Sequence, residues 1–334
     1  MANGEKMKIW YDACTGKHVR YAVAVAKRFR ELGHEMILTT RRHPDTTALA
    51  NILNEKFTVV GAYNPRSLYT RLKESARRML QFCKMFEENP PDIAIAHQSV
   101  ELCRVAFGLN IPIILTADTP HAYAVNKLTI PFSDTLITSE AIPKNFFKKY
   151  GAQKIIQFKG VDEVAWIKNF RPTKKYQFEK PLIIIRQMET RASYAIGKTD
   201  ITEKLTKKLS SLGNVLFLPR FHGKRKKELK TPKEYIDSAT LVAHADLVIG
   251  IGGTITREAA LQGIPTIAIS TLGYSYVNHY LAKKGFPLFI VKPSKVLTYA
   301  KKHIGKKLDV REKLKELENP VDVVEKAVRE IKNK

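Results

Sequence analysis

The sequence predicts an α/β protein built of two parallel-sheet domains that face each other across a cleft. Three observations lead to this prediction. Short apolar runs alternate with amphipathic segments along the chain, and the alternation restarts after an irregular basic stretch. The chain has 334 residues, of which 44% are hydrophobic, which suits two globular domains of about 150 residues each.

Seven apolar runs in the first half are predicted to be strands, because they are short and are bounded by polar or turn-forming residues. They cover residues 7–12, 35–40, 57–60, 92–97, 112–117, 134–139 and 154–158. Helices are expected between them, most clearly over residues 18–34 and 67–87. The second helix is expected to pack on the core through one apolar stripe, formed by Leu68, Leu72, Ala76, Met79, Cys83 and Phe86. Its opposite face is basic and is expected to be in water.

Five further runs begin a second series of strands, at residues 182–186, 214–220, 246–250, 265–270 and 287–291. The turn-rich segment between the two series has no clear periodicity and is interpreted as a linker. The expected organisation is an N-terminal domain over 1–160, a linker over 161–180 and a C-terminal domain over 181–318. A last helix over 319–334 is expected to pack back on the first domain.

The chain is strongly basic, since 57 Lys and Arg against 32 Asp and Glu leave a net charge of +25. Nucleic acid, anionic lipid and phosphorylated substrates are the partners that such a charge attracts. Nucleic acid is disfavoured, because no basic motif with interleaved aromatic residues is present. The helix over 67–87, with the basic stretches 223–230 and 301–307, offers a contact for an anionic membrane, and simple solubility is the alternative.

Location and redox state are inferred from what the sequence lacks. The three cysteines show neither a paired pattern nor a zinc-site spacing, which favours reduced thiols. The N-terminus has no apolar signal-peptide core, and no apolar run approaches the roughly 20 residues of a membrane span. A cytoplasmic protein is therefore expected, with the inner face of the membrane as a second candidate location and the oligomeric state open.

The most informative motif is GIGGTITREAALQGIP, over residues 250–265, where a strand passes into a helix. Backbone N–H groups at such a point can bind an anion. The motif does not fit the fingerprint of a nicotinamide dinucleotide site, because Ile255 stands at its third glycine position and no acid lies between Glu258 and Asp309. The acid lies inside the helix instead. Glu258 is placed to accept two ribose hydroxyls while the amides of Gly252, Gly253 and Thr254 face a diphosphate, with a solvated helix residue as the alternative for Glu258.

This motif carries a resemblance. The pattern from Gly252 to Pro265, in the second of two Rossmann-like domains, resembles the GT-B glycosyltransferases and the related non-hydrolysing UDP-N-acetylglucosamine 2-epimerases. The stretches over residues 8–42 and 116–134 are similar to a family of GT-B-like proteins without assigned function that is frequent in archaea. The resemblance implies a donor nucleotide on the second domain, with Glu258 on its ribose, and an acceptor on the first domain.

Two departures from the epimerases favour a transferase. The epimerases carry an H-R-x-E-N stretch after the first strand of the second domain, where this chain has IIIRQMETRASYA. They also carry a carboxylate-bearing H-V-E-A-G loop, where this chain has ADTPHAYA. The epimerase reaction therefore stays as the alternative.

Catalytic residues are expected at the carboxyl edge of the first sheet, where open α/β folds bind their ligands. His18 follows the loop DACTGK and is the candidate general base, since histidine titrates near neutral pH. This loop resembles the histidine-bearing loop of the lipid-linked N-acetylglucosamine transferase of peptidoglycan synthesis. Asp118 and His121 follow the strand PIILT and are candidates to deprotonate an acceptor. The alternatives are a solvated helix-start histidine and a capped turn before Pro120.

Cations for the leaving diphosphate are expected from Arg186, Arg191 and Arg257. The sequence therefore predicts a glycosyltransferase that moves a sugar from a nucleoside diphosphate, most simply UDP, to an unidentified acceptor. Membrane-linked acceptors are among the candidates. No metal and no other cofactor are expected. From another class, a non-catalytic binder of nucleic acid or anionic lipid remains the alternative.

Overall fold

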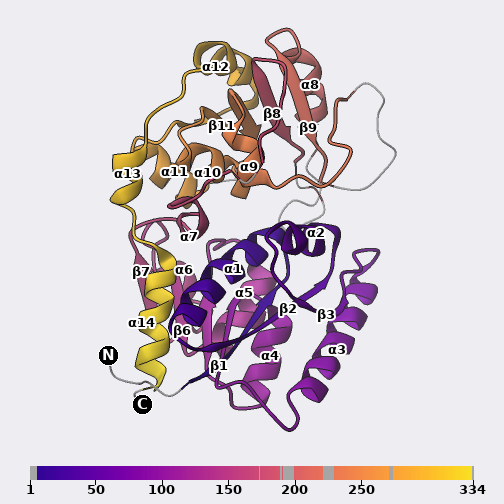
Figure 1. Cartoon of the computed structure of the whole chain (residues 1–334), viewed down its shortest axis with the longest axis vertical. Coiled ribbons are helices and arrows are strands. Elements are labelled where there is room, and N and C mark those ends of the chain that lie inside the picture. Colours follow the sequence, from indigo (N-terminus) through magenta and orange to yellow (C-terminus); the bar gives the residue numbers. More distant parts are fainter. Residues whose placement is uncertain are drawn as a thin grey trace. The chain divides into compact units, whose positions relative to one another are not determined.

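The computed structural model describes residues 6–172, 174–188, 190, 199–220, 229–270 and 274–332 (Figure 1). The chain divides into two compact units. The N-terminal unit comprises Met1–Trp166 with Glu318–Lys334, and the C-terminal unit comprises Ile167–Leu317. The boundary lies inside the segment interpreted as a linker, where a short helix, α7 (Val164–Ile167), forms. Arg191 and residues 223–228 of one basic stretch lie outside the described residues.

The N-terminal unit contains one sheet of seven parallel strands in the order β3-β2-β1-β4-β5-β6-β7. Its strands are β1 (Lys8–Ala13), β2 (Glu35–Arg42), β3 (Thr58–Ala62), β4 (Ile93–His97), β5 (Ile113–Thr116), β6 (Thr135–Ser139) and β7 (Ile155–Phe158). The order reverses between β1 and β4, so the loops that follow these two strands leave toward opposite faces of the sheet. Such a point is where doubly wound folds bind their ligands.

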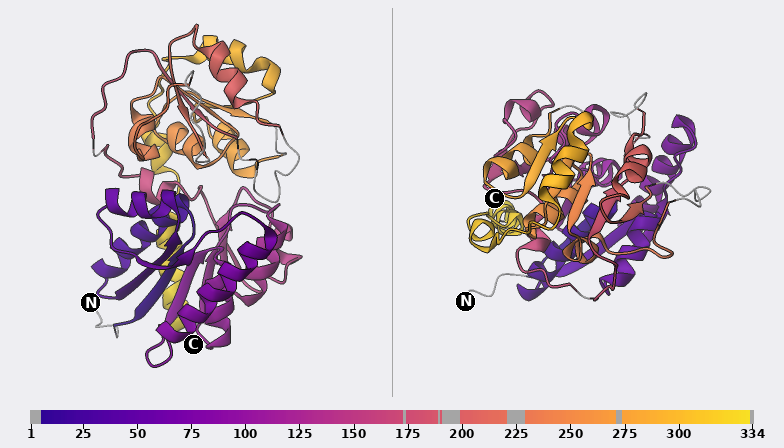
Figure 2. Two further views of the ribbon diagram at one scale, coloured as in Figure 1. Left: turned by 90° about the vertical axis from the view of Figure 1, so that its right-hand side faces the viewer. Right: turned by 90° about the horizontal axis from the view of Figure 1, so that it is seen from above.

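Helices cover both faces of this sheet (Figure 2, left). They are α1 (Gly16–Glu31), α2 (Pro44–Ile52), α3 (Leu68–Met85), α4 (Val100–Gly108), α5 (Tyr123–Thr129), η1 (Ile130–Phe132), α6 (Asn145–Lys148) and α14 (Pro320–Lys332). The first helix begins at Gly16 because the Thr15 hydroxyl accepts from the backbone N–H of His18. Gly33, with φ +86°, follows its end.

The C-terminal helix α14 completes the N-terminal unit. Val321, Val324 and Val328 are buried in the same apolar cluster as α1 and the strands of the first sheet. Arg28 of α1 forms ion pairs with Asp322 and Glu325, at 2.7 and 2.6 Å. These contacts join the last helix of the chain to its first (Figure 1).

The C-terminal unit contains a second, separate sheet of five parallel strands in the order β12-β11-β10-β8-β9. Its strands are β8 (Leu182–Arg186), β9 (Asn214–Leu218), β10 (Leu247–Gly250), β11 (Thr266–Ile269) and β12 (Leu288–Val291). Its helices are α8 (Thr202–Leu209), α9 (Ser238–Ala243), α10 (Thr254–Leu261), α11 (Tyr276–Lys283), η2 (Pro293–Lys295), α12 (Val296–His303) and α13 (Arg311–Lys315). Alternate strand residues enter two apolar clusters, one on each face of the sheet. The two parallel sheets confirm the predicted fold class.

The prediction that α3 packs on the core through its apolar stripe is wrong for Leu68, Leu72, Ala76 and Cys83, which are exposed. Met79 is half-buried, and Phe86, just after the end of the helix, is buried as expected. Leu68 and Leu72 are 82% and 69% exposed, and Cys83 is exposed as well. Arg78 and Phe82 face inward instead, at 1% exposure or less. The helix is turned about its axis, since Arg78 pairs with Asp12 and Phe82 packs on Trp10, and these two side chains occupy its buried face.

In the described part of the chain, no helix combines the length and the apolar character that a membrane crossing requires.

Candidate functional site

A cluster of charged side chains lies where the strands of the first sheet end. Lys17 enters from the first turn of α1, and Asp118 and Asp162 enter from the loops that follow β5 and β7. The Lys17 ammonium lies 2.5 Å from Asp118 Oδ2 and 2.7 Å from Asp162 Oδ2. All three side chains are at most 10% exposed. The positive charge of one lysine therefore offsets part of the negative charge of two carboxylates, whose burial without a cation would be costly.

His97, the last residue of β4, belongs to the same cluster. Its Nδ1 lies 2.8 Å from the Thr116 hydroxyl, and its Nε2 lies 3.5 Å from Asp118 Oδ1. His97, Asp118 and Asp162 offer three ligand atoms within 4.8 Å of one another, which is a spacing that a metal ion can bridge. The Lys17 ammonium contacts both carboxylates of this set.

His18 stands beside this cluster, with its ring centroid 4.9 Å from that of His97. Burial, together with the nearby His97 and Lys17, lowers the pKa of His18 well below its usual value. The backbone N–H of Cys14 donates to His18 Nδ1 at 3.3 Å. The ring is therefore neutral with its proton on Nε2, and it presents a hydrogen-bond donor. This arrangement favours a donating role over the general-base role expected from the sequence.

The two other residues expected on this edge lie in the loop after β5. Asp118 is held by Lys17 and also accepts from the Thr119 hydroxyl at 2.8 Å, so it is more than the cap of a local turn. His121 is exposed, three residues further on. Partial loss of hydration of the ring lowers the pKa of His121, although the charge of Asp118 raises it, so this ring is mainly neutral near pH 7.

Sequence reasoning missed Lys17, His97 and Asp162 as members of the site. Their signal is positional, since each lies at or just after the carboxyl end of a buried strand. Asp162 was hidden because its segment has the composition of a linker. Its carboxylate is 2% exposed and contacts a lysine 145 residues earlier in the chain.

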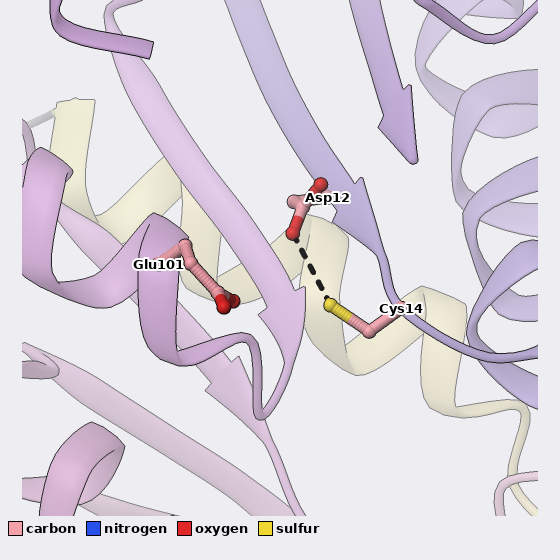
Figure 3. Close-up of side chains that lie close together, drawn as sticks. All are labelled: Asp12, Cys14 and Glu101. Carbon is pink, nitrogen blue, oxygen red and sulfur yellow. Dashed lines mark hydrogen bonds between the residues drawn. The ribbon is translucent and has the colours of Figure 1, made fainter. Parts of the chain in front are cut away.

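A second polar cluster includes Asp12, Cys14 and Glu101 (Figure 3). It lies at the end of β1, directly before the loop that carries Lys17 and His18. Asp12 of β1 accepts from Arg78 of α3 through both oxygens, at 2.5 and 3.0 Å, and Arg78 also reaches Glu101 at 3.3 Å. The Cys14 thiol points toward Asp12 Oδ2, at 3.4 Å. Burial and the Asp12 charge raise the pKa of Cys14 to about 12, so the thiol stays protonated.

The glycine motif of the C-terminal unit forms a tight turn into α10. Gly252 has φ +87°, and a side chain there would collide with Asn278 Nδ2. Its carbonyl accepts from Arg257 Nη1 and from Asn278 Nδ2, both at 3.0 Å. Gly253 is the N-cap residue of α10, and Thr254 is the first residue of that helix and is half-buried. A side chain at Gly252 is therefore excluded, and α10 begins directly after the turn.

The charged residues around this turn are more buried than the sequence suggests. Glu258 is completely buried and accepts from the Ser238 hydroxyl at 2.6 Å, so it is not a solvated helix residue. Arg257 is 5% exposed and is bonded to the turn itself. Arg186 donates to the Pro219 carbonyl at 2.9 Å.

Arg220, which the sequence analysis did not single out, has its guanidinium beside Gly253. Its Nη2 lies 3.9 Å from the position that a Cβ on this glycine would take. Its Nε donates to the Gln187 carbonyl at 3.4 Å, which holds the side chain toward the turn. Arg220 therefore joins the cations near the amino end of α10.

The fold matches solved structures over almost the whole chain. UDP-GlcNAc 2-epimerase of Methanocaldococcus jannaschii superposes with a TM-score of 0.72 and 16% identity, over 98% of this chain and 100% of the other. The glycosyltransferase SnogD of Streptomyces nogalater gives a TM-score of 0.58 and 16% identity, over 97% and 99%. At these identities the likeness shows the two-domain GT-B fold.

Sequence comparison identifies the family. An uncharacterised protein of Methanocaldococcus jannaschii is 33% identical over 335 residues, which cover 95% of this chain and 96% of the relative. Residues 7–333 match the family model described as protein of unknown function (DUF354). The chain therefore belongs to the DUF354 family.

Proposed function

We propose that the protein is a metal-independent glycosyltransferase that uses a nucleoside-diphosphate sugar. The observation that carries this proposal is the cluster at the end of the first sheet, where Lys17, His97, Asp118 and Asp162 bring acid–base groups together with an internal cation. Such groups suit proton transfer to and from a hydroxyl. The GT-B fold supports the proposal, since structures that share it include glycosyltransferases and an epimerase solved with UDP-GlcNAc and UDP.

The donor is proposed to bind in the C-terminal unit, at the amino end of α10. The amides of Gly253 and Thr254 and the positive end of the helix face the diphosphate, and Arg220 adds a full positive charge. Arg186 and Arg257 hold the backbone around this anion site. Glu258 accepts the ribose hydroxyls in place of the Ser238 hydroxyl that it holds in this structure.

The acceptor is proposed to bind in the N-terminal unit. His121, exposed and neutral, takes the proton of the acceptor hydroxyl, whose oxygen then bonds to the anomeric carbon of the donor sugar. The bond between that carbon and the diphosphate breaks, and the nucleoside diphosphate leaves with the electron pair. His18 donates from Nε2 to a substrate oxygen, while Asp118 is held in place by Lys17.

A nucleotide-sugar 2-epimerase is the second candidate. The observation that favours it is the presence of two carboxylates and two imidazoles at one sheet edge, because an epimerisation needs a base and an acid around one carbon. It requires no acceptor. The products therefore separate the two reactions.

The first experiment is a thermal-shift screen of the full chain against UDP-, GDP-, dTDP- and CMP-sugars. A ligand present at 100 times its Kd adds roughly 2.7 kcal/mol to the stability of the folded state. A shift with one nucleotide series supports the donor site, and no shift with any series overturns the proposal.

The second experiment follows the products of the sugar that binds, by NMR and chromatography. Release of nucleoside diphosphate only when a glycosyl acceptor is added supports transfer, whereas a changed configuration at C2 without an acceptor assigns the epimerase. His121→Asn is expected to keep nucleotide binding and to lower kcat by about 100-fold or more, the range of a lost general base. In the wild type, kcat/KM should rise with pH through a midpoint below pH 6.5, because the pKa of His121 is lowered.

A further inference from the structure

Helix α3 exposes a continuous apolar face. Leu68, Tyr69, Leu72 and Leu80 are 82%, 69%, 69% and 65% exposed. At about 100° per residue these four side chains fall within a sector of about 120°, and the exposed Ala76 and Cys83 lie in the same sector. Single exposed apolar residues are ordinary on a protein surface, but a contiguous patch on one helix marks an interaction site.

The helix cannot turn this face inward, because its opposite side is fixed. Arg78 is bonded to Asp12 and to the Val60 carbonyl, and Phe82 is completely buried against Trp10. Within the N-terminal unit, α3 packs on β3 and α4 and lies at the periphery (Figure 1). The apolar face is therefore directed away from the core by the ion pair beneath it.

Basic side chains lie next to the apolar face, along one of its two long edges. Lys73, Lys84 and Arg77 occupy the next sector of about 40° around the helix, and all three residues are exposed. The single acidic residue of α3, Glu74, pairs with Arg77 at 2.9 Å. An apolar face with a basic border is the pattern of a helix that lies in the plane of a membrane interface.

We propose that α3 is a docking face for an anionic lipid bilayer. Its apolar face enters the boundary between headgroups and acyl chains, and Lys73, Arg77 and Lys84 contact lipid phosphates. Charge favours this occupant over a second copy of the chain. A symmetric dimer would bring the same basic border of two molecules together, each with a net charge of +25. The proposal goes beyond the reaction, since it concerns where the protein works.

The test is binding of the purified full chain to vesicles of phosphatidylcholine with 30% phosphatidylglycerol, followed by flotation at several lipid concentrations, without nucleotide. The wild type should float with these vesicles and not with phosphatidylcholine alone. Leu72→Glu with Leu80→Glu should weaken binding at least tenfold. Lys73→Glu, Arg77→Glu and Lys84→Glu together should weaken it at least roughly 100-fold, since losing three basic residues at about fivefold each gives that factor and the new negative charges add repulsion.

Matched controls use exposed positions elsewhere. Leu308→Glu changes an apolar residue of the C-terminal unit that is 44% exposed, and Lys204→Glu, Lys207→Glu and Lys208→Glu on α8 reverse the same number of charges. Both controls should bind nearly as the wild type does. If the α8 variant lost as much vesicle binding as the α3 charge variant, the binding would depend only on the net charge of the protein, and the proposal would be overturned. A wild type that ignores anionic vesicles would also overturn it, and so would a dimer in sedimentation that Leu72→Glu with Leu80→Glu dissociates.

Discussion

Arg78 and Asp12 form a buried ion pair through two hydrogen bonds, of 2.5 and 3.0 Å, which joins α3 to β1. Burial alone would raise the pKa of Asp12. The positive charge of Arg78 lowers it, and so do the hydrogen bonds that Asp12 accepts from Arg78, Ser99 and Thr39, so that the pKa is lowered overall. The same pair sets the rotation of α3, and Asp12 lies two residues before Cys14, which bonds to His18. One interaction thus shapes both the exposed face of α3 and the candidate site.

The pair predicts a large stability cost for Arg78→Met. Removing the guanidinium leaves Asp12 and Glu101 buried without their cation, which costs about 3–5 kcal/mol. Denaturant unfolding measures this cost. Arg77→Met, one residue earlier and exposed, is the matched control and should change stability by about 0.5 kcal/mol or less. Similar costs for the two variants would contradict the assigned rotation of α3.

His18 predicts a pH dependence of stability. Its folded-state pKa lies below the unfolded value of about 6.5, so the unfolded chain binds the extra proton first as pH falls. The contribution is fully present above pH 6.5 and is lost below it, by up to about 1.4 kcal/mol per pH unit. His18→Asn should therefore show a shallower loss of stability than the wild type between pH 6.5 and 5, in urea titrations at several pH values. Parallel curves would mean that His18 titrates normally.

Replacing Lys17 is expected to create a metal-binding site. In Lys17→Met, Asp118 and Asp162 lose their shared cation, and with His97 they present the ligand set described above. Calorimetry should then detect Mn²⁺ or Zn²⁺ binding that the wild type lacks, accompanied by a rise in stability. His97→Ala in the same background should weaken that binding. Metal binding by the wild type at this edge would contradict the idea that Lys17 supplies the charge.

Glu258 tests the donor site. Glu258→Gln should weaken nucleotide-sugar binding by about 1.5–3 kcal/mol, the range for a hydrogen bond to a charged group, in calorimetric titrations with the nucleotide that the screen selects. Folding should change little, because the amide oxygen can still accept from Ser238. Ser238→Ala is the control, since it removes the intramolecular partner and keeps the carboxylate. An affinity unchanged in Glu258→Gln would remove this residue from the ribose site.

The alternation of strands and helices could be predicted from the sequence, and so could the location of one glycine turn. Runs such as residues 182–186 are buried on both faces of a parallel sheet, so they are apolar throughout and stand out locally. Gly252 is recognisable because a left-handed turn before a helix excludes side chains. His18, Asp118 and His121 were placed on the correct sheet edge for a similar reason, since each follows a recognisable strand.

The rest depends on contacts between distant parts of the chain. Lys17 meets Asp118 and Asp162 from 101 and 145 residues away, and no local pattern contains that information. The position of the proton on the His18 ring depends on the backbone N–H of Cys14. Which side of α3 faces the core depends on the buried Arg78. The sequence by itself determined the two sheets, because buried parallel strands occur in it as short apolar runs. Only the tertiary structure decided which charges pair, because pairing energies depend on distances and burial that arise after the chain has folded.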